Sequence, residues 1–177
     1  MAAIKVQRPL GSRSCAIQLT GNRPAKGYEW DHVSELNGVG LADCFFARSA
    51  ILSPYSEVQL HTASAKVKLK EKRATQGKLK FGPGNRNDVA ASKNRDASGV
   101  LELKFNDIPH DWQEKKMWLR VYFAEPKREP TTLLRLHMNC KLSDDHPLGN
   151  GHELQSADMI EAKRRLEDHY QGNGGRR

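Results

Sequence analysis

Hydrophobic and polar residues alternate along three stretches in the second half of the chain. The apolar positions are Leu101, Leu103 and Phe105 in the first stretch, Met117, Leu119, Val121 and Phe123 in the second, and Leu134, Leu136, Met138, Cys140 and Leu142 in the third. A period of two residues is typical of a β-strand that buries one face. The connections between the stretches are short and polar, which favours consecutive antiparallel neighbours. We therefore predict a meander of three half-buried strands.

A further alternating stretch runs through a lysine-rich segment. From Lys66 to Lys70, three lysines alternate with Val67 and Leu69. The alternation begins earlier, at Val58, and shifts by one residue near Thr62, as a β-bulge would cause. In an extended chain these lysines share one face, and the apolar residues share the other. This pattern predicts a cationic strand, which brings the sheet to five or six strands.

Helical spacing is confined to the C-terminal part of the chain. The pattern predicts a helix near residues 156–170, with Ser156 as its N-cap and Gly172 as its stop signal. Glu161 precedes Arg165 by four residues, which favours an ion pair on one helix face. The predicted fold is α+β and β-rich, with a single antiparallel sheet or small, partly open barrel, followed by this helix. Residues 86–98 are predicted to form a polar loop.

The composition indicates one soluble domain with loose ends. The chain has 177 residues, of which 37% are hydrophobic and 28% charged, and its mean hydropathy is −0.73. We expect a disordered basic N-terminal arm at 1–26, a globular domain at 27–171 and a flexible tail at 172–177. The arm has an alternative interpretation as an ordinary frayed terminus. No apolar run approaches the roughly 20 residues that span a bilayer, so any membrane contact is expected to be peripheral.

Three features bear on localisation. The N-terminus lacks the continuous apolar segment of a secretory signal. Ala2 occupies the position where myristoylation requires glycine. Three cysteines without metal or redox spacing suit a reducing compartment. Residence in the cytosol or nucleus is therefore expected.

The positive charge of the protein is concentrated in Lys66–Arg95. This segment has ten basic residues against Glu71 and Asp88, a net charge of +8, which equals that of the whole chain. A one-sided basic strand and loop over 66–98 would bind polyanions such as nucleic acid, a nucleocapsid or an anionic membrane. Lysines also protect edge strands from aggregation, which is the alternative explanation of the alternation. The candidate polyanion-binding residues are Lys66, Lys68, Lys70, Lys72, Arg73, Lys78, Lys80, Arg86, Lys93 and Arg95.

The preceding segment, residues 28–65, has the opposite charge. It carries five acidic residues against Arg48 alone, a net charge of −4. An acidic patch beside a basic one allows head-to-tail self-association into an open homo-oligomer, with Glu29, Asp31 and Glu35 as candidate contacts. Alternatively, the two segments neutralise each other within one molecule.

No motif points to catalysis, a metal or a cofactor. Cys44 lacks the surroundings of an activated nucleophile, and a buried structural thiol is the favoured interpretation. The stretch from His146 to His152 lacks metal-ligand spacing and the glycine-lysine signature of a phosphate loop, so a surface turn is favoured. We therefore expect a protein that is not an enzyme.

This plan resembles the matrix proteins of rhabdoviruses. The shared features are a small basic chain, a cationic N-terminal arm, one β-rich domain and a basic loop without an enzymatic motif. The length and charge are similar to those of the plant-infecting cytorhabdoviruses. Animal rhabdovirus matrix proteins carry a proline-rich budding motif ending in tyrosine, whereas this chain has only Ser53, Pro54 and Tyr55. The resemblance implies a virion protein in the host cytoplasm that self-associates, condenses the ribonucleoprotein and bridges it to the envelope's inner leaflet.

Two other classes of function remain open. The first is a sequence-nonspecific RNA-binding viral accessory protein, such as a silencing suppressor or movement protein. In that case Phe81, Trp112, Trp118 or Tyr122 would stack on bases, but the aromatic residues interleave poorly with the lysines. The second is a cellular β-domain that binds an acidic protein partner.

Overall fold

The computed structural model describes residues 29–33, 57–82, 87–112, 115–126, 132–142 and 151–173. The predicted N-terminal arm, Glu35, Cys44, Arg86 and the stretch 146–150 lie outside these residues. The predictions made for them therefore stay predictions.

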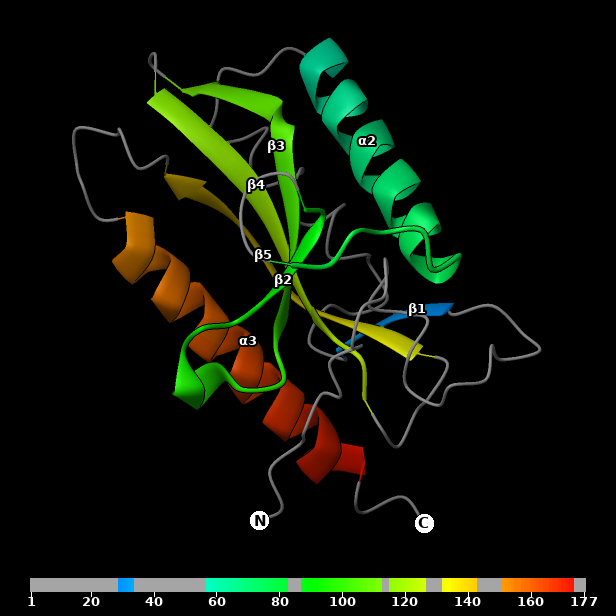
Figure 1. Cartoon of the computed structure of the whole chain (residues 1–177), viewed down its shortest axis with the longest axis vertical. Helices are drawn as coiled ribbons and strands as arrows, with labels where there is room; N and C mark the ends of the chain where they lie inside the picture. Colours follow the sequence, from blue (N-terminus) through cyan, green and yellow to red (C-terminus); the bar gives the residue numbers. More distant parts are fainter. Residues whose placement is uncertain are drawn as a thin grey trace.

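A single five-stranded sheet forms the centre of the protein (Figure 1). Its order is β1-β5-β4-β3-β2, and the strands are β1 (Glu29–His32), β2 (Val89–Ala91), β3 (Leu101–Trp112), β4 (Lys115–Ala124) and β5 (Thr132–Leu142). β3, β4 and β5 are consecutive antiparallel neighbours, which confirms the predicted meander. β2 pairs antiparallel with β3, whereas β1 pairs parallel with β5. The α+β, β-rich fold is thus confirmed, and the sheet is open and mixed.

Two helices cover opposite faces of the sheet, with α2 (Glu57–Thr75) on one side and α3 (Gly151–Asn173) on the other (Figure 1). The core is divided accordingly. One apolar cluster joins α2 to Leu103, Phe105 and Val121, and the second joins α3 to Leu134 and Leu136. The strands are therefore covered on both faces where the helices pack, not half-buried as predicted.

A β-bulge divides the apolar residues of β5 between the two faces. Tyr122 of β4 lies opposite His137, and the next residue, Phe123, lies opposite Arg135, which leaves Leu136 as the extra residue. Leu134 and Leu136 consequently pack on the α3 side, while Met138 packs on the α2 side. The prediction that these residues share one face is wrong, because local alternation alone does not locate a bulge.

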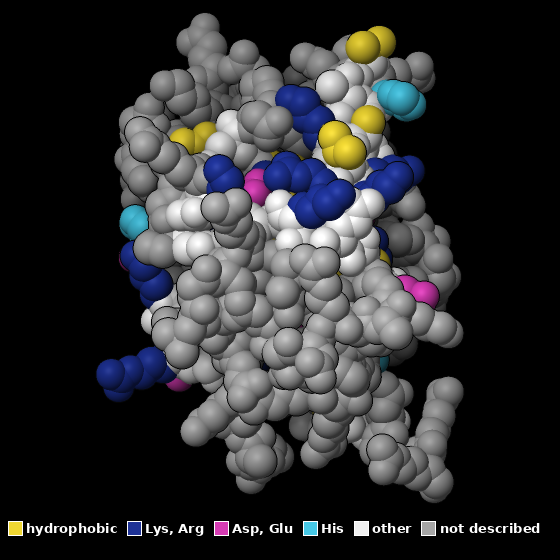
Figure 2. Space-filling view, turned by 45° about the vertical axis from the view of Figure 1, so that its right-hand side comes forward, with side chains coloured by type: hydrophobic (Ala, Val, Ile, Leu, Met, Phe, Trp, Pro, Cys, Tyr) yellow, Lys and Arg dark blue, Asp and Glu magenta, His cyan; other side chains and the backbone are white. Residues whose placement is uncertain are grey.

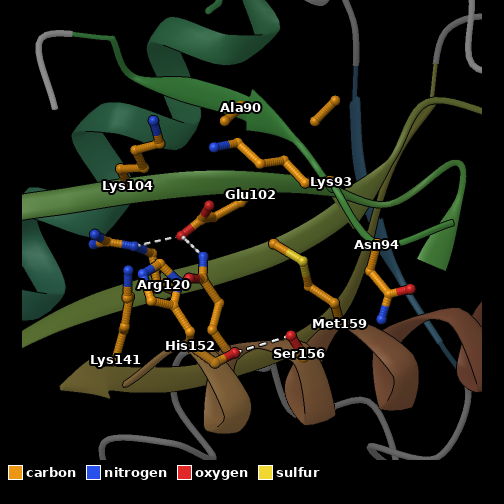
Figure 3. Close-up of a pocket in the computed structure, with 12 residues that line it drawn as sticks. Ala90, Lys93, Asn94, Glu102, Lys104, Arg120, Lys141, His152, Ser156 and Met159 are labelled. Atoms are coloured by element: carbon orange, nitrogen blue, oxygen red, sulfur yellow. Dashed lines mark hydrogen bonds and ion pairs between the residues drawn. The ribbon is translucent and has the colours of Figure 1, made fainter. Parts of the chain in front are cut away.

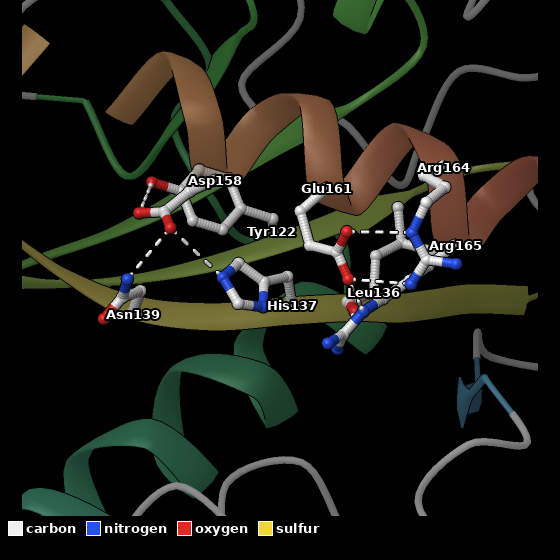
Figure 4. A network of polar contacts seen from close by, with 8 residues as sticks. All are labelled: Tyr122, Leu136, His137, Asn139, Asp158, Glu161, Arg164 and Arg165. Atoms are coloured by element: carbon white, nitrogen blue, oxygen red, sulfur yellow. Dashed lines mark hydrogen bonds and ion pairs between the residues drawn. The ribbon is translucent and has the colours of Figure 1, made fainter. Parts of the chain in front are cut away.

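Polar contacts fasten α3 to the sheet (Figure 4). The Asp158 carboxylate accepts a hydrogen bond from Asn139 Nδ2 at 2.9 Å and from Tyr122 Oη at 3.4 Å, and lies 3.2 Å from His137 Nε2. Burial, and then the Asp158 charge, raise the pKa of Tyr122 well above its ordinary range. Arg165 donates from Nη1 to the carbonyl of Leu136 at 3.0 Å, which satisfies an acceptor at the bulge. Because Tyr122 is fully buried, this network is structural.

The start of α3 differs from the prediction. The helix begins at Gly151, and Ser156 lies inside it, where its hydroxyl donates to the carbonyl of His152 at 2.9 Å. Ser156 is therefore not the N-cap, since an intrahelical bond to residue i−4 uses its hydroxyl. The predicted pair of Glu161 and Arg165 is confirmed at 2.8 Å. The helix includes Gly172 and ends at Asn173, so Gly172 is not its stop signal.

The lysine-rich segment is a helix, and the predicted cationic strand with a bulge at Thr62 is wrong. Residues 57–75 form α2, whose buried positions Ala63, Val67, Glu71 and Ala74 recur at helical spacing. Lys, Glu, Ala, Leu and Arg are strong helix formers and dominate this segment. The lysine alternation fits either structure, and the packing of the buried stripe on the sheet favours the helix.

The end of α2 is a Schellman motif. Gly77 has φ of 65°, its N–H donates to the carbonyl of Ala74 at 2.9 Å, and the N–H of Lys78 donates to that of Arg73 at 2.9 Å. Glycine is the residue best suited to this left-handed conformation. The segment after the helix also corrects the predicted loop at 86–98, which contains β2 and the 3₁₀ helix η2 (Arg95–Ala97).

Candidate polyanion-binding surface

The basic residues of α2 follow both edges of its buried face. At 3.6 residues per turn, Lys66 and Lys70 lie along one edge with Arg73, whereas Lys68 and Lys72 lie along the other. The single row of lysines predicted for a strand is therefore wrong. Lys68 and Lys72 are exposed, and Lys66 is half-buried.

Apolar side chains lie on the outer face of α2, between these two basic edges. Val58 is 74% exposed and Leu69 is 62% exposed, and Ala65 lies between them on the same face. Figure 2 shows Lys and Arg side chains gathered on this side of the molecule, with hydrophobic side chains of the helix beside them. In a strand, Leu69 was expected to face the core with Val67, but in the helix only Val67 is buried. Sequence reasoning therefore missed this apolar surface.

Asp88 connects the basic residues to the sheet. Its carboxylate lies 3.2 Å from Lys70 Nζ and 3.8 Å from Arg73 Nη2, and it accepts a hydrogen bond from the backbone N–H of Lys80 at 3.0 Å. Lys70 also donates to the carbonyl of Lys104 at 2.5 Å and lies 4.9 Å from the ring centre of Phe105. Lys70 thus has a structural role beside its charge, and its side chain is only 16% exposed.

The surroundings of Asp88 favour its ionised form. Partial burial raises the pKa of this carboxyl, but the Lys80 N–H and the charges of Lys70 and Arg73 outweigh that effect. The pKa therefore lies below its ordinary value, and Asp88 stays charged at neutral pH.

A second cluster anchors α2 to the sheet from Glu71. Arg135 of β5 forms two hydrogen bonds with the Glu71 carboxylate, at 2.8 and 2.9 Å, and its guanidinium lies 4.7 Å from the ring of Trp30. Trp30 of β1 donates from Nε1 to the carbonyl of Glu71 at 2.9 Å and packs edge-on against Phe123. These contacts fix the orientation of α2 and hence of its lysines.

The remaining candidate basic residues divide between the two sides of the sheet. Lys78 and Lys80 are exposed and follow α2 directly, so they extend its basic surface. Lys93 and Arg95 lie beside α3, because Lys93 follows β2 and Arg95 begins η2, which packs on α3. The structure therefore does not bring all ten predicted residues together.

The predicted acidic contacts lie away from α2. Glu29 and Asp31 are exposed in β1 and alternate with Trp30, whose side chain faces α2. They share the face of Val33, which packs in the α3-side cluster. Glu29 and Asp31 thus lie on the opposite face of the sheet from the basic edges of α2, whereas Lys93 and Arg95 lie on the α3 side as well.

Base stacking by the predicted aromatic residues is restricted. Tyr122 is fully buried, and Phe81 is partly buried against the core. The ring of Trp118 is half-buried and lies near the charges of Arg120 and Lys141, at 5.5 and 6.0 Å. Tyr122 is therefore excluded as a base-stacking residue.

The described residues contain no group of three His, Cys, Asp or Glu side chains that could hold a metal ion. In the same part of the chain, neither α2 nor α3 combines the length and the apolar character needed to cross a bilayer. Comparisons of the chain with protein-family models, with curated proteins and with solved structures found no match.

Proposed function

We propose that this protein is a viral structural protein of the matrix type. It self-associates, condenses the viral ribonucleoprotein and bridges it to the anionic inner leaflet of the envelope. The observation that supports this proposal is the outer face of α2, where exposed apolar residues lie between two basic edges.

Each part of this face has a physical role at a membrane. Lysines near an anionic leaflet each contribute about 1 kcal/mol of attraction. Val58 and Leu69 then enter the boundary between headgroups and acyl chains, as the apolar face of an interfacial helix does. The same lysines neutralise phosphates when the partner is RNA, where apolar side chains add little.

Co-sedimentation with anionic vesicles, neutral vesicles and RNA tests this proposal. The double variant Lys68→Gln/Lys72→Gln removes two positive charges from α2, and we expect anionic vesicle binding to weaken about 30-fold. The control variant Arg95→Glu lowers the net charge by the same amount, but at a position beside α3. We expect it to bind anionic vesicles nearly as well as the wild type does. Equal losses in both variants would show that net charge, not the α2 surface, determines binding.

The apolar residues separate a matrix protein from a plain RNA binder. Leu69→Ser removes an exposed apolar side chain without changing any charge. We expect this variant to lose vesicle affinity and to keep RNA affinity. A protein that binds RNA but not anionic vesicles would instead be a sequence-nonspecific RNA-binding accessory protein.

A further inference from the structure

A hydroxyl group, that of Thr62, interrupts the apolar surface on the outer face of α2. Thr62 is exposed, and it lies one helical turn after Val58 and two turns before Leu69. Its hydroxyl donates to the carbonyl of Val58 at 2.8 Å, so the side chain lies against the preceding turn. Any group added to this hydroxyl would therefore stand between the apolar side chains that the proposed function places in the membrane boundary.

The other serines and threonines of α2 and α3 are less accessible. Ser64 and Thr75 of α2 are half-buried. Ser156 of α3 is half-buried as well, lines the cavity between α3 and the sheet, and donates to the carbonyl of His152 (Figure 3). Thr62 is thus the exposed hydroxyl-bearing residue among the serines and threonines of these two helices.

The sequence after Thr62 is basic. Lys66 lies four residues after Thr62, one helical turn away, and Lys68 and Lys70 follow it. Kinases distinguish their substrates partly by the pattern of charges around the acceptor hydroxyl. This pattern suits a serine/threonine kinase that prefers basic substrates.

The described contacts that fasten α2 to the sheet lie beyond Thr62. Val58, His61 and Thr62 are exposed, and Ala63 is the first buried side chain among those described in the helix. The polar contacts with the sheet come from Lys70 and Glu71, two turns further on. Local opening of the first two turns therefore exposes little apolar surface, and it lets a kinase bind Thr62 in an extended conformation.

We propose that Thr62 is a phosphorylation site, and that its phosphate releases the protein from anionic membranes. This inference rests on the proposed function, since it concerns the membrane-binding face of α2. In the reaction, Thr62 Oγ1 forms a bond to the γ-phosphorus of ATP while the bond from that phosphorus to the leaving ADP breaks. The proton of the hydroxyl passes to a base of the kinase.

The phosphate opposes membrane binding in two ways. It carries a charge of about −1.5 to −2 at pH 7, which cancels the attraction that about two lysines have for an anionic leaflet. It also places a charged, strongly hydrated group between Val58 and Leu69, which then cannot enter the headgroup boundary without removing that group from water. We therefore expect phosphorylation to weaken vesicle binding at least about 30-fold.

The modification itself is tested by incubating the protein with ATP, Mg²⁺ and protein kinase C, followed by mass spectrometry of its peptides. We expect a phosphate on Thr62 in the wild type, and none at this position in Thr62→Val. Co-sedimentation with vesicles of phosphatidylserine and phosphatidylcholine then compares the phosphorylated and unphosphorylated wild type. A phosphate found only on Ser64 or on other residues would overturn the assignment to Thr62.

Substitutions separate the effect of charge from that of polarity. Thr62→Glu and Thr62→Gln have side chains of similar size, and we expect the former to bind anionic vesicles about fivefold more weakly, because it adds one negative charge. Ala157→Glu adds the same charge at an exposed position of α3 and serves as the control. We expect this control to bind as the wild type does, and circular dichroism should show equal helix content in all variants.

The outcomes distinguish this inference from the proposed function on which it rests. Wild-type protein that binds vesicles, together with equal binding by Thr62→Glu and Thr62→Gln, would overturn the role of Thr62 and leave the membrane-binding function standing. Equal losses in Thr62→Glu and Ala157→Glu would likewise overturn it, because net charge alone would explain them. Wild-type protein that does not bind anionic vesicles would contradict both.

Discussion

At the scale of single residues, Asp88 determines how α2 and the chain after it fit together. In the sequence, Asp88 is simply one of two acidic residues within the basic segment 66–95. In the folded protein its carboxylate contacts Lys70, Arg73 and the N–H of Lys80, which come from α2 and from the chain leading to β2. Contacts of this kind depend on the tertiary structure, so sequence spacing alone could not reveal them.

Substitution of Asp88 should therefore destabilise the protein in a pH-dependent way. We expect Asp88→Asn to lower the free energy of unfolding by about 1–2 kcal/mol at neutral pH, because it removes the charge that faces Lys70 and Arg73. The folded-state pKa of Asp88 is depressed, so its stabilisation is present above the unfolded-state pKa of about 3.9 and is lost as pH falls through the folded-state value. Urea denaturation of both proteins at neutral pH and below pH 4 measures this. A difference that stays constant over that range would rule out an ionic role for Asp88.

At the scale of elements, the sequence allowed the sheet to be predicted better than the helices. The strands β3, β4 and β5 follow an alternation that persists over many residues. The bulge at Leu136 and the continuation of β3 to Trp112, with its register shift between Phe105 and His110, escaped prediction. α2 was missed because Lys-Val-Lys-Leu-Lys has period two, while its buried stripe includes the polar residue Glu71, which obscures the helical period. Glu71 is tolerated inside because Arg135 of β5 neutralises it.

The candidate sites were predicted only in part, because they depend on tertiary structure that a local sequence pattern does not contain. Clustering of basic residues along the chain was evident, but their division between two faces depends on the helix and on the path of the chain after β2. The charged residues Glu102, Lys104 and Arg120 occupy the polar positions of an alternating pattern and were expected to face solvent. They are buried because α3 forms a second layer over them, and a local pattern contains no information about that layer.

Gly77 offers a test of how α2 ends. Alanine at this position must adopt φ of 65°, which costs about 1–2 kcal/mol for a residue with a β-carbon. We expect Gly77→Ala to lower the free energy of unfolding by about that amount. Gly172→Ala, in the last turn of α3 where a new β-carbon meets no atom within 4 Å, should be neutral or slightly stabilising. Chemical denaturation of the two variants compares them, and equal stabilities would contradict the Schellman motif.

At the scale of the whole molecule, the sheet separates two kinds of surface. The α2 side presents the basic edges and the apolar stripe, whereas Glu29 and Asp31 project toward the α3 side from the edge strand β1. Glu29 and Asp31 therefore face away from the basic edges of α2. Neighbouring molecules can bring them together, and a head-to-tail contact of this kind propagates instead of closing into a dimer.

Light scattering tests whether such assembly occurs. We expect growth of particle size with protein concentration at low salt, and reversal as the Debye length falls from about 10 Å at 0.1 M to about 3 Å at 1 M. Glu29→Lys/Asp31→Lys should block this growth, because it replaces attraction to α2 by repulsion. The control Glu167→Lys/Asp168→Lys makes the same change in net charge on exposed positions of α3 and should still assemble. Loss of assembly in both variants would show that net charge alone determines assembly. A wild-type protein that stays monomeric at low salt and high concentration would contradict the matrix proposal, but it would not contradict polyanion binding by α2.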